Sequence, residues 1–473
     1  MARILFLQNI MYEFPSTTQL SAILKQNSHI CDVYISNNKN KIIREVEEFK
    51  PDIVAFNCTT GVHNWSIQIA SEIKREINVI TFFGGTHPTY YPEMIENESV
   101  DVICRGEGDL ALLKFADSLD KKKDITKIGN LWIKKNGIIY KNDILHLIED
   151  LDALPFPDRE IYYNKYKLLK NESRKSFLTT RGCPYRCSFC YHSGLKKIYN
   201  KKGRYIRRRG VDNVINEIKH VKENYALNTV YFIDDIFNLD RKWIKEFLKK
   251  YKKDINLPFI CLVRADLIDK EIAKLFNEAN CKCLFFGVES GNENLRNGLL
   301  KKDLTNEEII TAAYLLKKYK IKFRTYNMIG LPGESVDDAF RTIELNARIN
   351  TDYPWCSIYQ PYPGTELANY SEYNRMVKND ANSIEPYFAS SQLKDFSNEF
   401  INLHRLFILS VKFPSLIPLI KRVVKFPPNP FFDLIFAVSY FYTYVGSENL
   451  SILRALFLGV RSVKSIFGVR YAV

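Results

Sequence analysis

Short runs of consecutive apolar residues alternate, along the first part of the chain, with longer stretches in which apolar residues recur every three or four positions. The short runs predict buried strands at residues 3–8, 52–58, 79–83 and 100–104. Strand and helix in regular alternation indicate a parallel sheet covered on both faces, hence a doubly wound, Rossmann-like α/β domain over residues 1–146. Asn136-Gly137 between two β-prone arms predicts that this domain closes with a hairpin.

A second alternation follows a proline-containing linker that we predict at residues 147–170. Further strands are predicted at residues 177–180, 229–233, 259–263, 283–288, 322–329 and 354–360. Thr305-Asn-Glu-Glu308 is a capping box that begins one of the intervening helices. Six β/α units indicate a partial TIM-type (β/α)6 barrel over residues 171–365. Residues 366–473 are mostly helical by pattern, and we expect them to form a C-terminal cap.

The composition excludes several classes of protein. Of the 473 residues, 46% are hydrophobic and 26% are charged, which is ordinary for a globular chain and excludes wholesale disorder and coiled coil. No run of about 18 uncharged apolar residues occurs, so no membrane-spanning helix is expected. The N-terminus lacks a small-residue cleavage site and predicts no signal peptide. We therefore expect a cytoplasmic protein.

The formal net charge of +14 is concentrated in two basic blocks. Residues 403–473 hold nine Lys or Arg against two acidic residues, and residues 196–209 hold eight positive charges and no negative ones. Such blocks attract the phosphates of nucleic acid, lipid or a cofactor, or they form a solvated face. The C-terminal block is also rich in aromatic residues, so it is either a helical cap on the barrel or a surface in peripheral contact with a membrane.

Three of the ten cysteines form a compact motif, Cys183-Pro-Tyr-Arg-Cys187-Ser-Phe-Cys190, at the end of the first predicted barrel strand. Three thiolates within eight residues can hold one corner of an iron–sulfur cluster, and since such clusters take four ligands, one iron is left open. Zinc is the alternative, but it favours a second pair of ligands, which is not evident here. The spacing therefore predicts a cluster bound by Cys183, Cys187 and Cys190.

At these residues the chain resembles the radical S-adenosylmethionine (SAM) superfamily. The resemblance implies a 4Fe–4S cluster whose open iron binds SAM, and reductive cleavage of SAM to a radical that abstracts hydrogen from a substrate. It extends to three later motifs at predicted strand ends, Tyr231-Phe-Ile-Asp234-Asp235, Phe286-Gly-Val-Glu289-Ser290-Gly291 and Met328-Ile-Gly330-Leu-Pro-Gly333-Glu334. It implies cofactor-binding roles for residues of these motifs and of the cysteine loop, namely Phe189, Asp234, Asp235, Glu289, Ser290, Gly330 and Gly333.

Several of these residues have a structural alternative. The acidic pair Asp234 and Asp235 either meets SAM or substrate or merely caps a turn. Arg264, at the end of the third predicted strand, either pairs with the SAM carboxylate or forms an ion pair with Asp266. His192 either adjusts the cluster through a hydrogen bond or is a surface residue.

The N-terminal domain resembles the cobalamin-binding domain fused to many radical SAM enzymes. The resemblance rests on polar and glycine residues after predicted strands, which are candidate cofactor contacts: Thr59, Thr60, Gly84, Gly85, Gly106 and Glu107. Glycines at strand ends of a doubly wound sheet open a crevice for a large ligand. The Asp-x-His-x-x-Gly loop that supplies an axial histidine in many cobalamin proteins is absent, and neither His63 nor His87 has that context. The lower axial position stays unassigned.

Three functions remain open at this point. The first is a cobalamin-dependent radical SAM methyltransferase acting on an unactivated carbon of a small or lipid-like substrate, with an electron donor such as flavodoxin or ferredoxin. The second is an oxidative cyclase or a rearrangement enzyme with the same two domains. The third is a basic iron–sulfur protein that binds nucleic acid. The set of barrel motifs argues against the third, because a structural cluster needs no SAM pocket, and we expect no nucleic-acid partner.

Overall fold

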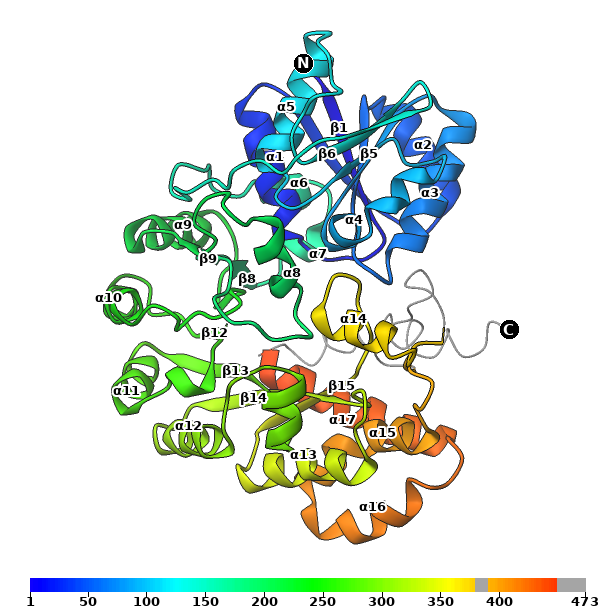
Figure 1. The fold of residues 1–473 in the computed structure, drawn as a ribbon. Helices are drawn as coiled ribbons and strands as arrows, with labels where there is room; N and C mark the ends of the chain where they lie inside the picture. The colour runs from blue at the N-terminus through cyan, green and yellow to red at the C-terminus, as the bar shows by residue number, and fades with distance from the viewer. Residues whose placement is uncertain (379–389, 449–473) are drawn as a thin grey trace.

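The first domain is built on a mainly parallel sheet of seven strands. A computed structural model describes residues 1–378 and 390–448 (Figure 1). The strand order is β2-β1-β3-β4-β5-β6-β7, and every pair from β2 to β5 is parallel. The strands are β1 (Arg3–Gln8), β2 (Ile30–Ile35), β3 (Ile53–Asn57), β4 (Ile80–Gly84), β5 (Val102–Cys104), β6 (Leu131–Lys135) and β7 (Ile138–Lys141). The predicted doubly wound sheet is confirmed, and the predicted hairpin is β6-β7.

Helices cover both faces of this sheet because each carries one apolar stripe. On one face α1 (Pro15–Gln26) and α5 (Asp109–Asp120) pack over the strands, and on the other face α2 (Lys39–Phe49) and α3 (His63–Glu76) do so. The pattern did not predict β2, an edge strand interrupted by Asp32 whose outer positions are only half-buried. Tertiary pairing with β1 therefore decides its conformation.

The segment predicted as a linker is packed into the first domain. It carries two short helices, α6 (Glu160–Tyr163) and α7 (Lys167–Lys170), whose apolar side chains join the core under α1 and α5. The hydroxyl of Tyr162 donates to Gln8 Oε1 of β1 at 2.7 Å. The chain thus enters the second domain from a fixed position.

The second domain is a partial barrel of six parallel strands. Their order is β15-β14-β13-β12-β11-β8. They are β8 (Arg174–Phe177), β11 (Thr229–Phe232), β12 (Phe259–Leu262), β13 (Cys281–Glu289), β14 (Lys322–Ile329) and β15 (Tyr353–Ile358). The outer layer is formed by α9 (Val211–Asn224), α10 (Arg241–Asp254), α11 (Lys270–Glu278), α12 (Asn306–Lys318) and α13 (Val336–Arg348). The predicted barrel is confirmed, although the first strand begins three residues earlier than predicted, and a separate short ladder joins β9 (Thr180–Arg181) to β10 (Arg207–Arg208).

The C-terminal region is helical, as predicted, and it also completes the barrel. It contains α14 (Glu366–Tyr373), α15 (Asn398–Lys412), α16 (Ile417–Val423) and α17 (Pro430–Glu448). Glu448, at the end of α17, is buried between Arg174 of β8 and Arg324 of β14, and its carboxylate lies 2.8 Å from the Arg324 guanidinium. Because these arginines lie near the amino ends of strands on opposite sides of the barrel, α17 closes the barrel at that end.

Part of the predicted cap, residues 449–473, lies outside the described residues, as do residues 379–389. Within the helices that are described, none combines the length and the apolar character that crossing a membrane requires.

Candidate active site

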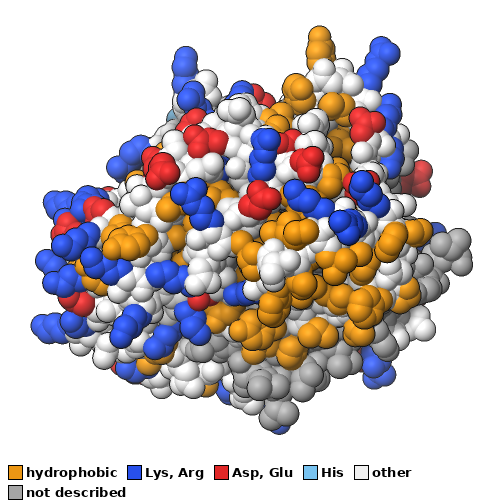
Figure 2. All heavy atoms as spheres, turned by 90° about the horizontal axis from the view of Figure 1, so that it is seen from below, with side chains coloured by type: hydrophobic (Ala, Val, Ile, Leu, Met, Phe, Trp, Pro, Cys, Tyr) orange, Lys and Arg blue, Asp and Glu red, His pale blue; other side chains and the backbone are white. Residues whose placement is uncertain are grey.

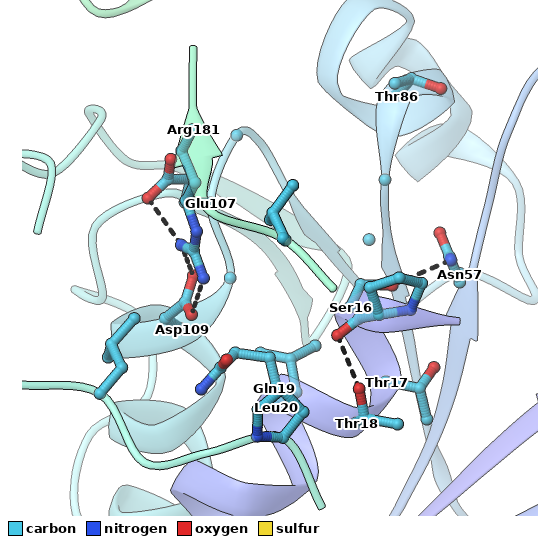
Figure 3. A pocket seen from close by; sticks show the side chains of 18 of the residues that line it. Ser16, Thr17, Thr18, Gln19, Leu20, Asn57, Thr86, Glu107, Asp109 and Arg181 are labelled. Atoms are coloured by element: carbon cyan, nitrogen blue, oxygen red, sulfur yellow. Dashed lines mark hydrogen bonds and ion pairs between the residues drawn. The ribbon is translucent and has the colours of Figure 1, made fainter. Parts of the chain in front are cut away.

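A cavity of about 450 Å³ lies between the two domains, at the carboxyl edge of the first sheet (Figure 3). The winding of the first sheet reverses between β1 and β3, and ligands of such sheets bind outside the strand ends at this point. From the first domain the lining includes Phe6, Ser16, Thr17, Asn57, Gly84, Gly85, Thr86, Gly106 and Glu107. From the barrel it includes Thr180, Arg181, Tyr191, His192, Tyr205, Arg207 and Asp235.

Ion pairs across the cavity edge hold the two domains together. Arg181, from β9, donates to both carboxylate oxygens of Asp109, at 2.9 and 3.0 Å, and to Glu107 at 3.2 Å. Arg207, from β10, also pairs with Glu107. Although burial opposes ionisation, Arg181 holds the pKa of Asp109 below its ordinary value. Glu107, a candidate cofactor contact, therefore has its carboxylate engaged by the barrel.

Tyrosines from each domain insert against glycines of the other. Tyr199 places its hydroxyl where a Cβ on Gly106 would lie, 2.1 Å from it, and accepts a hydrogen bond from the Glu107 amide at 2.6 Å. Tyr90 of the first domain packs in the same way on Gly364, and its hydroxyl donates to the carbonyl of Tyr191. The glycine of the predicted crevice at 106 thus serves domain contact as well as the cavity lining.

The three motif cysteines lie in the loop between β9 and α8 (Tyr191–Ile198). Burial raises the pKa of all three thiols, and of Cys190 to about 12. Ser188 fixes the loop: its amide donates to the Leu300 carbonyl at 2.9 Å and its hydroxyl to the Leu299 carbonyl at 2.6 Å. Sequence spacing found the thiols but not the role of Ser188.

The arrangement of the three thiols bears on the kind of metal group that they can hold. In the part of the chain that the structure describes, no three His, Cys, Asp or Glu side chains converge as the ligands of a single metal ion would. Each thiol nevertheless lies close enough to another for its charge to affect that group's pKa. Three thiols within eight residues that affect one another's charge suit one corner of an iron–sulfur cluster.

Charged residues surround Cys187. Lys302 forms an ion pair with Glu289 at 2.7 Å, and Lys302 and Arg264 both oppose the effect of burial on the pKa of Cys187. Glu289 has a φ of 63°, a backbone conformation that is rare for a residue with a side chain and is often retained at functional sites. Glu289, in the motif that ends β13, therefore lies close enough to the cysteine loop to affect the pKa of Cys187.

Ser290 and Arg264 make mainly structural contacts. The Ser290 side chain is fully buried, and its carbonyl accepts a hydrogen bond from Arg296 at 2.8 Å. Arg264 lies 2.8 Å from Asp266 and donates to the carbonyls of Lys302 and Asp303 at 2.6 Å. The ion pair of Arg264 with Asp266 is present, and the pairing of Arg264 with the SAM carboxylate stays a prediction.

The two acidic residues after β11 point in different directions. Asp234 is fully buried and accepts hydrogen bonds from the Thr179 amide at 3.0 Å and from its hydroxyl at 2.8 Å, and burial raises its pKa to about 6. Asp235 faces the cavity and lies 2.7 Å from Nε2 of His192. The other ring nitrogen of His192 lies 2.5 Å from the hydroxyl of Tyr205. Asp235, His192 and Tyr205 thus form a polar group on the cavity wall.

The glycine motif at the end of β14 lies beside an unusual carboxyl group. Gly330 and Gly333 both have positive φ, and a Cβ on Gly330 would lie 2.6 Å from the Phe396 ring. Glu334 accepts a hydrogen bond from the Leu331 amide at 3.0 Å, its other oxygen is buried without a hydrogen-bond partner among the described residues, and burial raises its pKa to about 8. Phe189 packs nearby, against the cluster that contains Leu331.

The candidate contacts on the first domain divide into two groups. Gly84 and Gly85 line the cavity. Thr59 and Thr60 do not, and the Thr60 hydroxyl instead lies 3.0 Å from Nδ1 of His87. His87 is buried and stacks on His63 at 4.0 Å, and burial lowers its pKa to about 3. The histidine pair lies outside the cavity lining.

The basic block at residues 196–209 is divided: Arg207 is buried, whereas Lys197, Lys201 and Arg204 are exposed. Arg207 pairs with Glu107, Arg209 with Glu217 at 2.5 Å, and Arg204 with Glu149 at 2.9 Å. Arg208 lies over the ring of Trp243. Arg207 therefore contributes to the junction between the domains, whereas Arg208 and Arg209 make contacts within the barrel.

Comparison with known proteins matches both domains. The model of the radical SAM superfamily matches residues 177–345, and that of the B12 binding domain matches residues 17–116. An uncharacterized methyltransferase of Pyrococcus horikoshii, PH0819, is 28% identical over 370 residues, which cover 76% of this chain and 78% of that protein. The anaerobic magnesium-protoporphyrin IX monomethyl ester cyclase of Rubrivivax gelatinosus is 25% identical over 344 residues, 70% of this chain but only 60% of that protein.

A solved structure has the same fold. The cobalamin-dependent SAM radical enzyme OxsB, solved with aqua-cobalamin and SAM bound, aligns with a TM-score of 0.69 at 17% identity. The alignment covers 94% of this chain and 72% of that one.

The residues present fit these cofactors. The loop supplies three thiols and no fourth, which suits a cluster with one open iron. Cations of Lys302 and Arg264 beside Cys187 suit an anionic cluster and the carboxylate of SAM. The cavity at the β1/β3 switch point suits a large ligand with a polar periphery, since hydroxyl and amide side chains border its apolar floor.

Proposed function

Because this chain belongs to the cobalamin-binding radical SAM enzymes, we propose that it transfers a methyl group to an unactivated carbon of a small or lipid-like substrate held between its domains. Its cofactors are a 4Fe–4S cluster, SAM and cobalamin, and its reaction requires a small-molecule substrate and a reductant. When bound, the cluster supplies the electron that cleaves SAM to a hydrogen-abstracting radical, and cobalamin supplies the methyl group.

The observation that carries this proposal is the continuous cavity between the two domains. Its lining runs from Asn57 and Gly85 of the first sheet to His192 and Asp235 beside the cysteine loop. A substrate in this cavity would have cobalamin on one side and the radical source on the other. Methyl transfer to a substrate radical needs this arrangement, because the two cofactors must reach one carbon atom.

The side chains of this chain have separate tasks in the proposal. Cys183, Cys187 and Cys190 hold the cluster, and Ser188 fixes their loop. Asp235 and Tyr205 are hydrogen-bonding groups that face the cavity, and they would orient a polar part of the substrate. Tyr90, packed between the domains, helps to exclude water, which protects a radical from side reactions.

Methyl-labelled SAM tests the proposal. The anaerobically reconstituted enzyme is incubated with SAM, a reductant and candidate substrates. Methylation consumes one SAM for hydrogen abstraction and a second as the methyl source. The expected products are 5′-deoxyadenosine and S-adenosylhomocysteine in equal amounts, with the label in the substrate. Label recovered only in SAM and in the methionine released by its cleavage, and never in a substrate that supports 5′-deoxyadenosine formation, would overturn methyl transfer.

A second candidate is an oxidative cyclisation or a rearrangement, because one relative that matches over both domains is named as a cyclase. In that case the substrate yields 5′-deoxyadenosine without S-adenosylhomocysteine. The ratio of the two products therefore separates the candidates.

A further inference from the structure

Helix α17 exposes an apolar stripe. Phe431, Leu434, Val438 and Tyr442 are each more than half exposed, and their spacing of three, four and four residues places them on one side of the helix. The opposite side carries Phe432, which is buried in the core shared with α15, and Phe436, which is buried against His404 of α15. Because α17 is apolar on both sides and only one side is buried in the core, its other apolar side is available to a binding partner.

The exposed apolar area continues onto the preceding segment. Phe413, Leu419 and Phe426, around α16, are also more than half exposed. Figure 2 looks onto the side of the molecule where α16 lies and shows a broad area of hydrophobic side chains there. Of the eleven large hydrophobic side chains that are more than half exposed in residues 1–378 and 390–448, seven lie between 413 and 442. We call these seven the α16–α17 surface, and apolar concentrations of this kind mark interaction sites.

The charges on the α16–α17 surface have one sign. Lys421, Arg422 and Lys425 are exposed on or just after α16. The two acidic residues of the same region do not add negative charge to this surface. Asp433 pairs with Arg405 at 2.8 Å, and Glu448 is buried inside the barrel. Two exposed acidic groups outside the segment, Asp337 and Glu344 of α13, form ion pairs with Lys421 at 3.8 and 3.9 Å, so the positive charge of the surface lies mainly on Arg422 and Lys425.

This pattern distinguishes between partners. A second copy of the chain would bring like charges together at the edge of the contact, which opposes association. A bilayer with anionic headgroups complements both features, since acyl chains accept the apolar stripe and headgroups attract the lysines and arginines. We propose that the α16–α17 surface lies on an anionic lipid bilayer, with α17 parallel to it and inserted on its exposed side. The proposal is independent of methyl transfer.

Vesicle sedimentation with the full, anaerobically purified chain tests the surface. The protein is expected to sediment with phosphatidylcholine vesicles that contain phosphatidylglycerol, and to bind them about tenfold more weakly without phosphatidylglycerol or at high salt. The double variant L434E/V438E should bind at least about tenfold more weakly than the native chain. Its matched control is I138E/Y314E, which places the same charges on two equally exposed apolar positions elsewhere and should bind like the native chain.

Size-exclusion chromatography with light scattering accompanies the vesicle measurement. Both variants replace exposed side chains, so unchanged circular dichroism is expected and shows that lost binding is not unfolding. The proposal is overturned if the native chain stays in the supernatant with every vesicle, or if L434E/V438E binds like the control. A native dimer that L434E/V438E dissociates would also overturn it and would assign the surface to a second copy.

Discussion

Arg181 of the barrel and Asp109 of the first domain form a two-pronged ion pair, with donor–acceptor distances of 2.9 and 3.0 Å. Asp109 is the first residue of α5, and Arg181 lies two residues before Cys183. The contact therefore joins the edge of the predicted cobalamin site to the beginning of the cysteine loop. Loss of this pair should affect both domains.

The variant D109N tests this coupling. It removes one charge of a buried pair and should lower the free energy of unfolding by about 3 kcal/mol at neutral pH. Because Arg181 holds the pKa of Asp109 below its ordinary value of 3.8, the pair stabilises the fold fully above that value. Its contribution is lost as the pH falls through the folded-state pKa. In urea unfolding, the difference in the free energy of unfolding between the native chain and D109N should therefore shrink as the pH is lowered. A difference that does not change with pH would contradict the assignment of the ion pair.

The contact of Tyr199 with Gly106 can be tested by the variant G106A, with G137A as its matched control. Gly106 and Gly137 have nearly equal φ, 77° and 76°, but a Cβ on Gly106 would lie 2.1 Å from the Tyr199 hydroxyl whereas one on Gly137 meets nothing within 4 Å. G137A should cost about 1 kcal/mol of stability through backbone strain alone. G106A should cost roughly 2 kcal/mol more and reduce bound cobalamin, because Tyr199 must move. If G106A and G137A lower the melting temperature equally, the packing of Tyr199 does not require a glycine at position 106.

The cysteines of the loop should behave as a set. C183A, C187A and C190A should each lose the iron–sulfur absorption and 5′-deoxyadenosine formation after anaerobic reconstitution. C31A, which removes a buried thiol far from the loop, is the control and should retain both. A full iron complement and native 5′-deoxyadenosine formation in any of the three variants would exclude that thiol as a ligand.

Variants of the two neighbouring aspartates should have different effects: D235N on activity and D234N on stability. D235N changes a cavity-facing group and should lower product formation at least about tenfold while leaving cluster content and melting temperature unchanged. D234N changes the buried acceptor of two hydrogen bonds from Thr179 and should chiefly lower the melting temperature. The assignment is wrong if D235N forms product at the native rate, or if its melting temperature falls as that of D234N does.

The sequence predicts features that depend on neighbouring residues, and it does not predict contacts between residues far apart in the chain. Residues 3–8 coincide with β1, because a strand buried on both faces has consecutive apolar residues in its sequence. The cysteine loop is likewise a local pattern. Tyr199 on Gly106 and Tyr90 on Gly364 join residues far apart in the chain, so no local pattern predicts them. The same holds for the inward direction of Asp234, which depends on Thr179 in a neighbouring strand–loop segment.

The central claim is that one cavity serves two cofactors, and cofactor content after anaerobic purification from cells supplied with cobalamin tests it most directly. Iron, sulfide and cobalamin are measured on the same sample, together with its absorption spectrum. The account predicts one cobalamin and one 4Fe–4S cluster per chain, and a G106A sample with its cluster retained and its cobalamin depleted. A native chain that holds the cluster but no cobalamin would contradict the account.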